Sequence, residues 1–219
     1  LLALKDKGQK QEDGNTVDFL WNTYGNVDKD AFKTEIAHMY RNGYKKIRFM
    51  DGKMEPFVVE REELYPYEEF FKDDYITNPG LQAAMLNYFQ EFRKQAPLEN
   101  RGDILKRREQ IMIDMMLNAE YMVPCVKEET EEEVEISHHF IDITDRVTEK
   151  EEGEHVIAIP VFTDGFEMDK CYEGHHENML YKFDELVSLM DELGASGIII
   201  NCLGISYFMR TALMKKILK

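Results

Sequence analysis

The most promising metal ligands in the sequence are Cys171, His175 and His176. Thiolate and imidazole groups both bind zinc and other transition metals. Cys171 and His175 form one loose pair, and no second pair completes a set of four ligands. His138 or His139 could add one ligand, because neighbouring residues in a strand face opposite sides. Two interpretations stay open: a zinc or other transition-metal site, in a metal-binding module or a metal-dependent enzyme, or a surface loop with incidental histidines.

Two carboxylates, Asp164 and Asp169, flank Gly165 directly after an apolar run. Carboxylates on a loop after a strand can perform acid–base chemistry or hold Mg²⁺ or Ca²⁺, but they are also the usual residues of turns. Open parallel α/β sheets tend to bind ligands beyond the carboxyl ends of their strands, where the loop 163–177 begins. We therefore expect four residues of this loop to form a ligand or partner surface: Thr163, Asp164, Phe166 and Asp169.

No set of residues in the sequence makes a coherent catalytic site. A nucleophilic Cys171 would need a nearby base and an orienting group, and no glycine-framed turn holds it beside His175. The glycines between 194 and 204 contain no GxGxxG pattern and no lysine after a glycine run, so they do not predict a phosphate-binding loop. The sequence therefore favours a protein without catalytic activity.

The loop 163–177 lies between two apolar segments, His155–Phe162 and Gly197–Asn201. Each is short and bounded by turn residues, which predicts a strand buried on both faces. Residues 178–193 carry apolar side chains at helical spacing, and a helix between two such strands predicts a parallel crossover. The predicted fold class is α/β (mixed α+β), with a small mixed sheet, helices packed on it and a strand–helix–strand unit at 155–201.

The rest of the chain divides into three predicted segments. Residues 1–16 are a polar, flexible lead-in, residues 17–77 form a small helix plus β-hairpin unit and a connector, and residues 78–219 form the α/β domain. Asn78-Pro79 is a typical helix start, with asparagine as the cap and proline in the first turn.

Three further elements are predicted in the α/β domain. Tyr121–Val126 is strand-like, although Pro124 favours an edge or the end of a strand. Residues 134–144 predict another strand. The apolar residues between Ile205 and Ile217 predict a last helix.

The chain of 219 residues carries a net charge of −16, which disfavours nucleic acid and anionic lipid and leaves a basic protein or a cation as partner. Residues 127–135 hold six glutamates and one lysine, which predicts a solvated loop or hairpin tip. No apolar run approaches the length of a membrane span. The three cysteines fit small buried residues in a reducing cytoplasm better than a disulfide framework.

The order of these segments resembles the N-terminal domain of the SseB family, named for enhanced serine sensitivity. The resemblance covers about residues 78–219 and rests on four motifs: the helix start at Asn78 and Leu81, Tyr121-Met-Val-Pro124, Ile159-Pro-Val-Phe-Thr-Asp164, and Gly197-Ile-Ile-Ile-Asn201 followed by Gly204. The family commonly has Asn-Pro after the last strand, whereas Cys202 follows Asn201 here. The resemblance implies a bacterial protein of mixed α/β fold without an established catalytic role, and it offers no catalytic residues to transfer.

The leading functional hypothesis is a cytoplasmic, non-enzymatic interaction or regulatory protein that binds a protein partner. In one variant of this hypothesis the partner is a basic protein. One alternative is the metal module or metal-dependent enzyme that uses the loop 171–177. The other is a small-molecule binding domain with a pocket at the turn 162–169.

Overall fold

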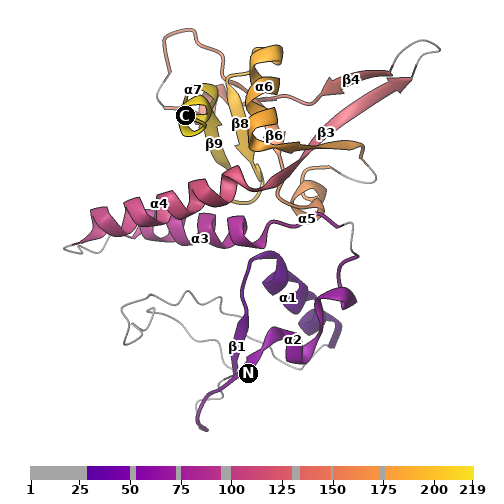
Figure 1. The fold of residues 1–219 in the computed structure, drawn as a ribbon, viewed down its shortest axis with the longest axis vertical. Coiled ribbons are helices and arrows are strands. Elements are labelled where there is room, and N and C mark those ends of the chain that lie inside the picture. Colours follow the sequence, from indigo (N-terminus) through magenta and orange to yellow (C-terminus); the bar gives the residue numbers. More distant parts are fainter. Residues whose placement is uncertain are drawn as a thin grey trace. The chain divides into compact units, whose positions relative to one another are not determined.

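The computed structural model describes residues 29–49, 53–72, 75–94, 100–129, 134–148, 150–172 and 176–219. The chain divides into two compact units, Leu1–Asp74 and Tyr75–Lys219 (Figure 1). The predicted lead-in at residues 1–16 and the predicted ligand His175 lie outside the described residues.

The first unit is a helix followed by an antiparallel hairpin and two short turns. Its elements are α1 (Lys29–Arg41), β1 (Lys46–Phe49), β2 (Phe57–Glu60), α2 (Arg61–Leu64) and the 3-10 turn η1 (Tyr67–Glu69). Gly43 follows α1 with a φ of 74°, a left-handed conformation that glycine adopts at little cost. The Arg61 guanidinium lies 4.0 Å from the Tyr40 ring centroid and donates to the carbonyls of Met39 and Tyr44, so it fastens the hairpin to the helix. The predicted helix–hairpin extension is confirmed.

The second unit begins with two helices and continues as a mixture of strands and helices (Figure 1). Its elements up to the third helix are α3 (Pro79–Arg93), α4 (Arg101–Leu117), β3 (Glu120–Glu129), β4 (Val134–His138), β5 (Ile141–Asp142), the 3-10 turn η2 (Thr144–Arg146), β6 (Ile157–Val161) and α5 (Gly165–Asp169). Its remaining elements are β7 (Asn178–Lys182), α6 (Phe183–Leu193), β8 (Gly197–Ile200), β9 (Tyr207–Arg210) and α7 (Thr211–Ile217).

The strands of the second unit form two sheets that are joined by one bridge. One sheet has the order β5-β6-β8-β9, in which β6 and β8 are parallel, and the other has the order β4-β3-β7 and is antiparallel. Met122 of β3 and Phe162 after β6 exchange two backbone hydrogen bonds of 2.9 Å. The predicted parallel pair and the predicted α/β class are confirmed.

Both faces of the β6–β8 pair are covered by apolar side chains. Ile198 belongs to a core with Met85 of α3, Met116 of α4 and Phe183 of α6. Its neighbour Ile199 belongs to a second core on the opposite face, which contains these residues: Ile143, Val156, Ala158, Phe162, Met168 and Cys202. Adjacent strand residues therefore pack into different cores, which explains why these strands are apolar along their whole length.

Two segments that were predicted as helices begin as strands. Residues 179–182 pair with β3, and α6 begins only at Phe183. In the same way Phe208 and Met209 lie in β9, and α7 begins at Thr211. Periodicity alone does not separate a short strand followed by a helix from one longer helix. The available edges of β3 and β8 supply the hydrogen bonds that decide for the strand.

Pro124 lies inside β3, and the prediction that it marks an edge or a strand end is wrong. Pairing with β7 runs from Glu120 to Pro124, and pairing with β4 begins at Cys125 on the other side. The His139 amide donates to the Pro124 carbonyl at 3.5 Å, but proline has no N–H to return this bond. The regular pairing with β4 therefore begins only at Cys125. The predicted strand at 134–144 is two strands, β4 and β5, separated by His139 and Phe140.

Candidate functional site

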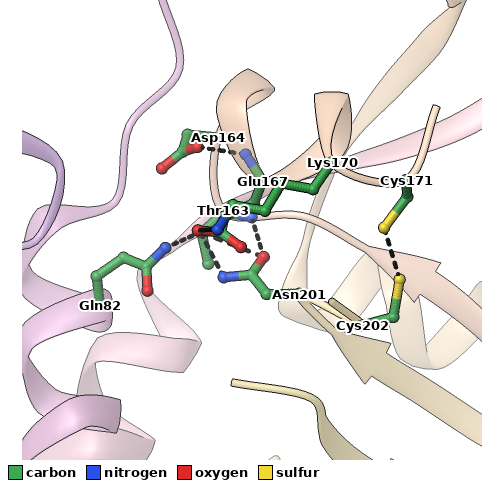
Figure 2. A network of polar contacts seen from close by, with 8 residues as sticks. All are labelled: Gln82, Thr163, Asp164, Glu167, Lys170, Cys171, Asn201 and Cys202. Atoms are coloured by element: carbon green, nitrogen blue, oxygen red, sulfur yellow. Dashed lines mark hydrogen bonds and ion pairs between the residues drawn. The ribbon is translucent and has the colours of Figure 1, made fainter. Parts of the chain in front are cut away.

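Polar side chains follow the two parallel strands and meet at their carboxyl ends (Figure 2). Thr163 comes directly after β6 and its bridge residue, and Asn201 comes directly after β8. The Asn201 Oδ1 accepts a hydrogen bond of 3.1 Å from the Thr163 amide, and the Asn201 Nδ2 donates one of 2.9 Å to the Thr163 hydroxyl. Because adjacent parallel strands end at the same edge, residues separated by 38 positions become hydrogen-bonding partners.

Helix α3 supplies the other two amides of this network. The Gln82 Nε2 donates to the Thr163 hydroxyl at 2.6 Å. The Asn78 Nδ2 donates to the carbonyl of Thr163 at 2.7 Å and to the carbonyl of Glu120 at 2.8 Å. Asn78 occupies the N-cap position of α3 but makes no side-chain cap bond, so the predicted capping role is wrong. Its side chain instead ties the helix start to β3 and β6.

The Asp164 carboxylate stabilises a turn, which was one of the two interpretations of this residue from the sequence. Its Oδ1 accepts from the Glu167 amide at 2.9 Å and caps α5, and Glu167 forms an ion pair of 2.6 Å with Lys170 (Figure 2). Thr163 and Asp164 are both 0% exposed. The two side chains are therefore covered in this conformation, and their predicted place in a ligand or partner surface stays a prediction.

The other two residues of the predicted surface lie at the outside of α5. Phe166 is 38% exposed, with the Lys170 ammonium 5.5 Å from its ring centroid, and Asp169 is exposed. Their role in binding stays a prediction. The four residues proposed from sequence thus separate into a buried pair, in which Thr163 joins the strand ends and Asp164 caps α5, and an exposed pair on a short helix.

Cys171 lies beside Cys202, with 3.0 Å between the two Sγ atoms (Figure 2). Both residues are free cysteines; Cys202 is buried and Cys171 is partly buried. Burial, followed by the neighbouring Cys171 thiol, raises the pKa of Cys202 to about 12. Sequence reasoning placed Cys171 with histidines and missed Cys202. The signal for the pair was the parallel arrangement of β6 and β8, which brings the segments after both strands together.

The imidazoles near Cys171 gather around a tyrosine. His139 and His176 lie with ring centroids 5.2 Å and 5.0 Å from that of Tyr172. Burial raises the pKa of Tyr172 to about 12. Among the residues that the structure describes, no group of three or more histidine, cysteine, aspartate or glutamate side chains is arranged to hold a metal ion. The zinc hypothesis stays a prediction, because His175 lies outside those residues.

A hairpin of β3 and β4 extends beyond the helices of the second unit (Figure 1). Val126 is 46% exposed and Ile136 is 39% exposed. The register pairs Val126 with Ser137 and Lys127 with Ile136, so the two apolar side chains lie on opposite faces of the ribbon. Each face of the ribbon therefore carries an exposed apolar side chain beyond Cys125, and none of the described ribbon residues there belongs to either core.

The same ribbon places two carboxylates directly opposite each other. Glu128 and Glu135 are paired in the register, and both are exposed. Like charges in directly opposed positions destabilise a pair of strands. The sequence adds four more glutamates between them, at 129 and 131–133. The hairpin thus combines exposed apolar groups with a concentrated negative charge.

A pocket of about 320 Å³ lies on the face of the β5-β6-β8-β9 sheet that carries the second core. Its lining includes Ile199, Phe208 and Ser206, and two basic side chains, Arg146 and Arg210. Arg210 also forms an ion pair of 2.8 Å with Glu154. None of the residues that line this pocket belongs to the turn 162–169, so the pocket predicted at that turn stays a prediction.

No family model matches this chain, and neither curated proteins nor solved structures give a match. The resemblance to the SseB family therefore stays a prediction. Within the part of the chain that the structure describes, no helix is both long enough and apolar enough to cross a membrane.

Proposed function

We propose that this chain is a non-enzymatic interaction or regulatory protein and that the β3–β4 hairpin binds a basic protein partner. The observation that carries the proposal is the hairpin itself, which exposes Val126 and Ile136 on opposite faces beside opposed carboxylates. A two-stranded ribbon with no core beneath it is marginal in water. A partner that packs against it supplies the missing apolar contacts.

Charge defines the kind of partner. The directly opposed Glu128 and Glu135 repel each other in the free protein. A lysine or arginine placed between them removes this repulsion and adds charge-assisted hydrogen bonds. The net charge of −16 also attracts a basic protein before contact. The same field opposes nucleic acid and anionic lipid, whose surfaces are negative.

The resemblance to the SseB family supports the non-enzymatic part of the proposal, because that family has no established catalytic role. The order of α3, β3, β6 and β8 in the second unit is compatible with an SseB-type domain over residues 78–219. A cytoplasmic location agrees with three cysteines that are all free thiols.

The proposal is tested by capturing partners from the source cell's lysate with wild type and with the double variant V126S/I136S. Quantitative mass spectrometry should show a basic protein that wild type enriches and the variant loses. The matched control is L213S/L218S, which removes two apolar side chains of comparable exposure at the end of the same unit. A partner that is lost equally with the control variant, or that survives the hairpin change, contradicts the assignment of the surface.

The pocket beside Arg146 and Arg210 favours a second candidate function, the binding of a small anionic molecule. Its volume of about 320 Å³ and its apolar floor at Ile199 and Phe208 suit a ligand of modest size. The guanidinium groups select a carboxylate or phosphate. A thermal-shift screen with inorganic phosphate, citrate and a nucleotide tests this candidate. A stabilisation that R146A reduces supports it, and unchanged melting with all three anions contradicts it.

A further inference from the structure

The fold brings the sulfur atoms of Cys171 and Cys202 together from distant positions in the sequence. Cys171 follows α5 and donates its amide to the Met168 carbonyl at 2.9 Å, and Cys202 follows Asn201 at the end of β8. Their Sγ atoms are 3.0 Å apart across 31 positions of sequence. A small shift of either side chain brings the sulfurs within bonding distance.

We propose that Cys171 and Cys202 form a reversible redox pair that closes to a disulfide on reaction with a low-molecular-weight disulfide such as oxidised glutathione. Cys171 is the attacking residue because it is the more exposed of the two. Cys202 is the resolving residue, since its position inside the second core shields it from the reagent.

The chemistry proceeds in two exchange steps. The Cys171 thiolate attacks one sulfur of the reagent, which forms a mixed disulfide at Cys171 and releases one reagent thiolate. The Cys202 thiol then gives up its proton and attacks the Cys171 sulfur, which releases the second reagent thiol. The sum is two protein thiols and one reagent disulfide converted to one protein disulfide and two reagent thiols. The raised pKa of Cys202 keeps it protonated until this second step.

The bond would link α5 to the end of β8, next to the buried network of Thr163 and Asn201. Helix α5 carries the exposed Phe166 and already packs against the second core through Met168. Oxidation would therefore add a covalent tie between the turn after α5 and the sheet, and reduction would remove it. The third cysteine, Cys125, lies in β3, where its pairing partner is His138, and it is outside this pair.

The test treats the full folded chain with oxidised glutathione, alkylates the remaining thiols after denaturation and maps the cysteine-containing peptides by mass spectrometry. In wild type, oxidation should remove the mass of two hydrogen atoms and link the peptides of Cys171 and Cys202. Cys125 should remain a thiol and be alkylated. C202S should stop at a glutathionyl group on Cys171, and C171S should leave Cys202 reduced. C125S is the matched control and should close as wild type does.

Three results for the treated wild-type protein would overturn the proposal. A glutathionyl group that accumulates on Cys171 without closure of the disulfide overturns the role of Cys202. A link that involves Cys125, or complete alkylation of Cys171 and Cys202 after treatment, overturns the pair. Reversal by dithiothreitol is expected, and a mass change that survives it counts against a disulfide.

Discussion

Replacing Asn201 by alanine removes the amide that joins the carboxyl ends of β6 and β8. Two hydrogen bonds to Thr163, of 3.1 Å and 2.9 Å, are lost, and a buried amide is left without its acceptor. This loss should cost about 2–4 kcal/mol of unfolding free energy. Asn201 also has a φ of 50°, a conformation that costs alanine about 1–2 kcal/mol more. N201A should therefore be destabilised by about 3–6 kcal/mol in urea unfolding followed by circular dichroism.

Two companion variants separate the causes. N201G loses the same hydrogen bonds but tolerates the left-handed backbone, so it should be destabilised less than N201A by about 0.5–1 kcal/mol. T163V removes the hydroxyl on the other side of the contact. The double variant T163V/N201A should cost less than the sum of the two single changes, since both break one network. Equal stability of N201A and N201G would refute the backbone argument, and strict additivity would refute the network.

Three further predictions concern other parts of the second unit. Closing the Cys171–Cys202 disulfide across 31 positions should raise the unfolding free energy by about 3–4 kcal/mol in urea, and C171S should remove the gain. Burial lowers the pKa of His138 from its ordinary value of 6.5, so the unfolded chain binds a proton before the folded chain does as the pH falls. The unfolding free energy should therefore decrease once the pH is below about 6.5, and H138Q should show a flatter pH profile in thermal melts. G197A should lower the unfolding free energy by about 1–3 kcal/mol, because the added Cβ would overlap the Met209 carbonyl of the neighbouring strand, and an unchanged melting temperature would contradict that packing.

The parallel pair at the centre of the second unit could be predicted from sequence because burial on both faces leaves a direct mark. Ile198 and Ile199 pack into opposite cores, so the strand has no polar face. The strand at Met179–Lys182 could not be predicted in the same way. Its apolar residues fit the helical spacing of α6, and only the position of β3 beside it decides its conformation.

The candidate site was predicted less well than the fold, because its contacts join distant residues. A threonine and an aspartate after a strand are typical of an exposed turn, and nothing local shows that Asn201 and Gln82 bury Thr163. The partner of Cys171 was missed for the same reason. Cys202 is far away in sequence and becomes a neighbour only through the shared edge of β6 and β8.

The opposed carboxylates of the hairpin provide the most direct test of the proposed function. E128Q/E135Q removes their repulsion, so the free protein should become more stable by about 0.2–1 kcal/mol while its affinity for the captured basic partner falls. The measurement is partner affinity by titration calorimetry at two salt concentrations, beside urea unfolding of each protein. The control E151Q/E152Q, which neutralises two exposed carboxylates in a turn of the same unit, should leave affinity nearly unchanged. Undiminished affinity in E128Q/E135Q, or an equal loss in the control, would contradict binding through the hairpin.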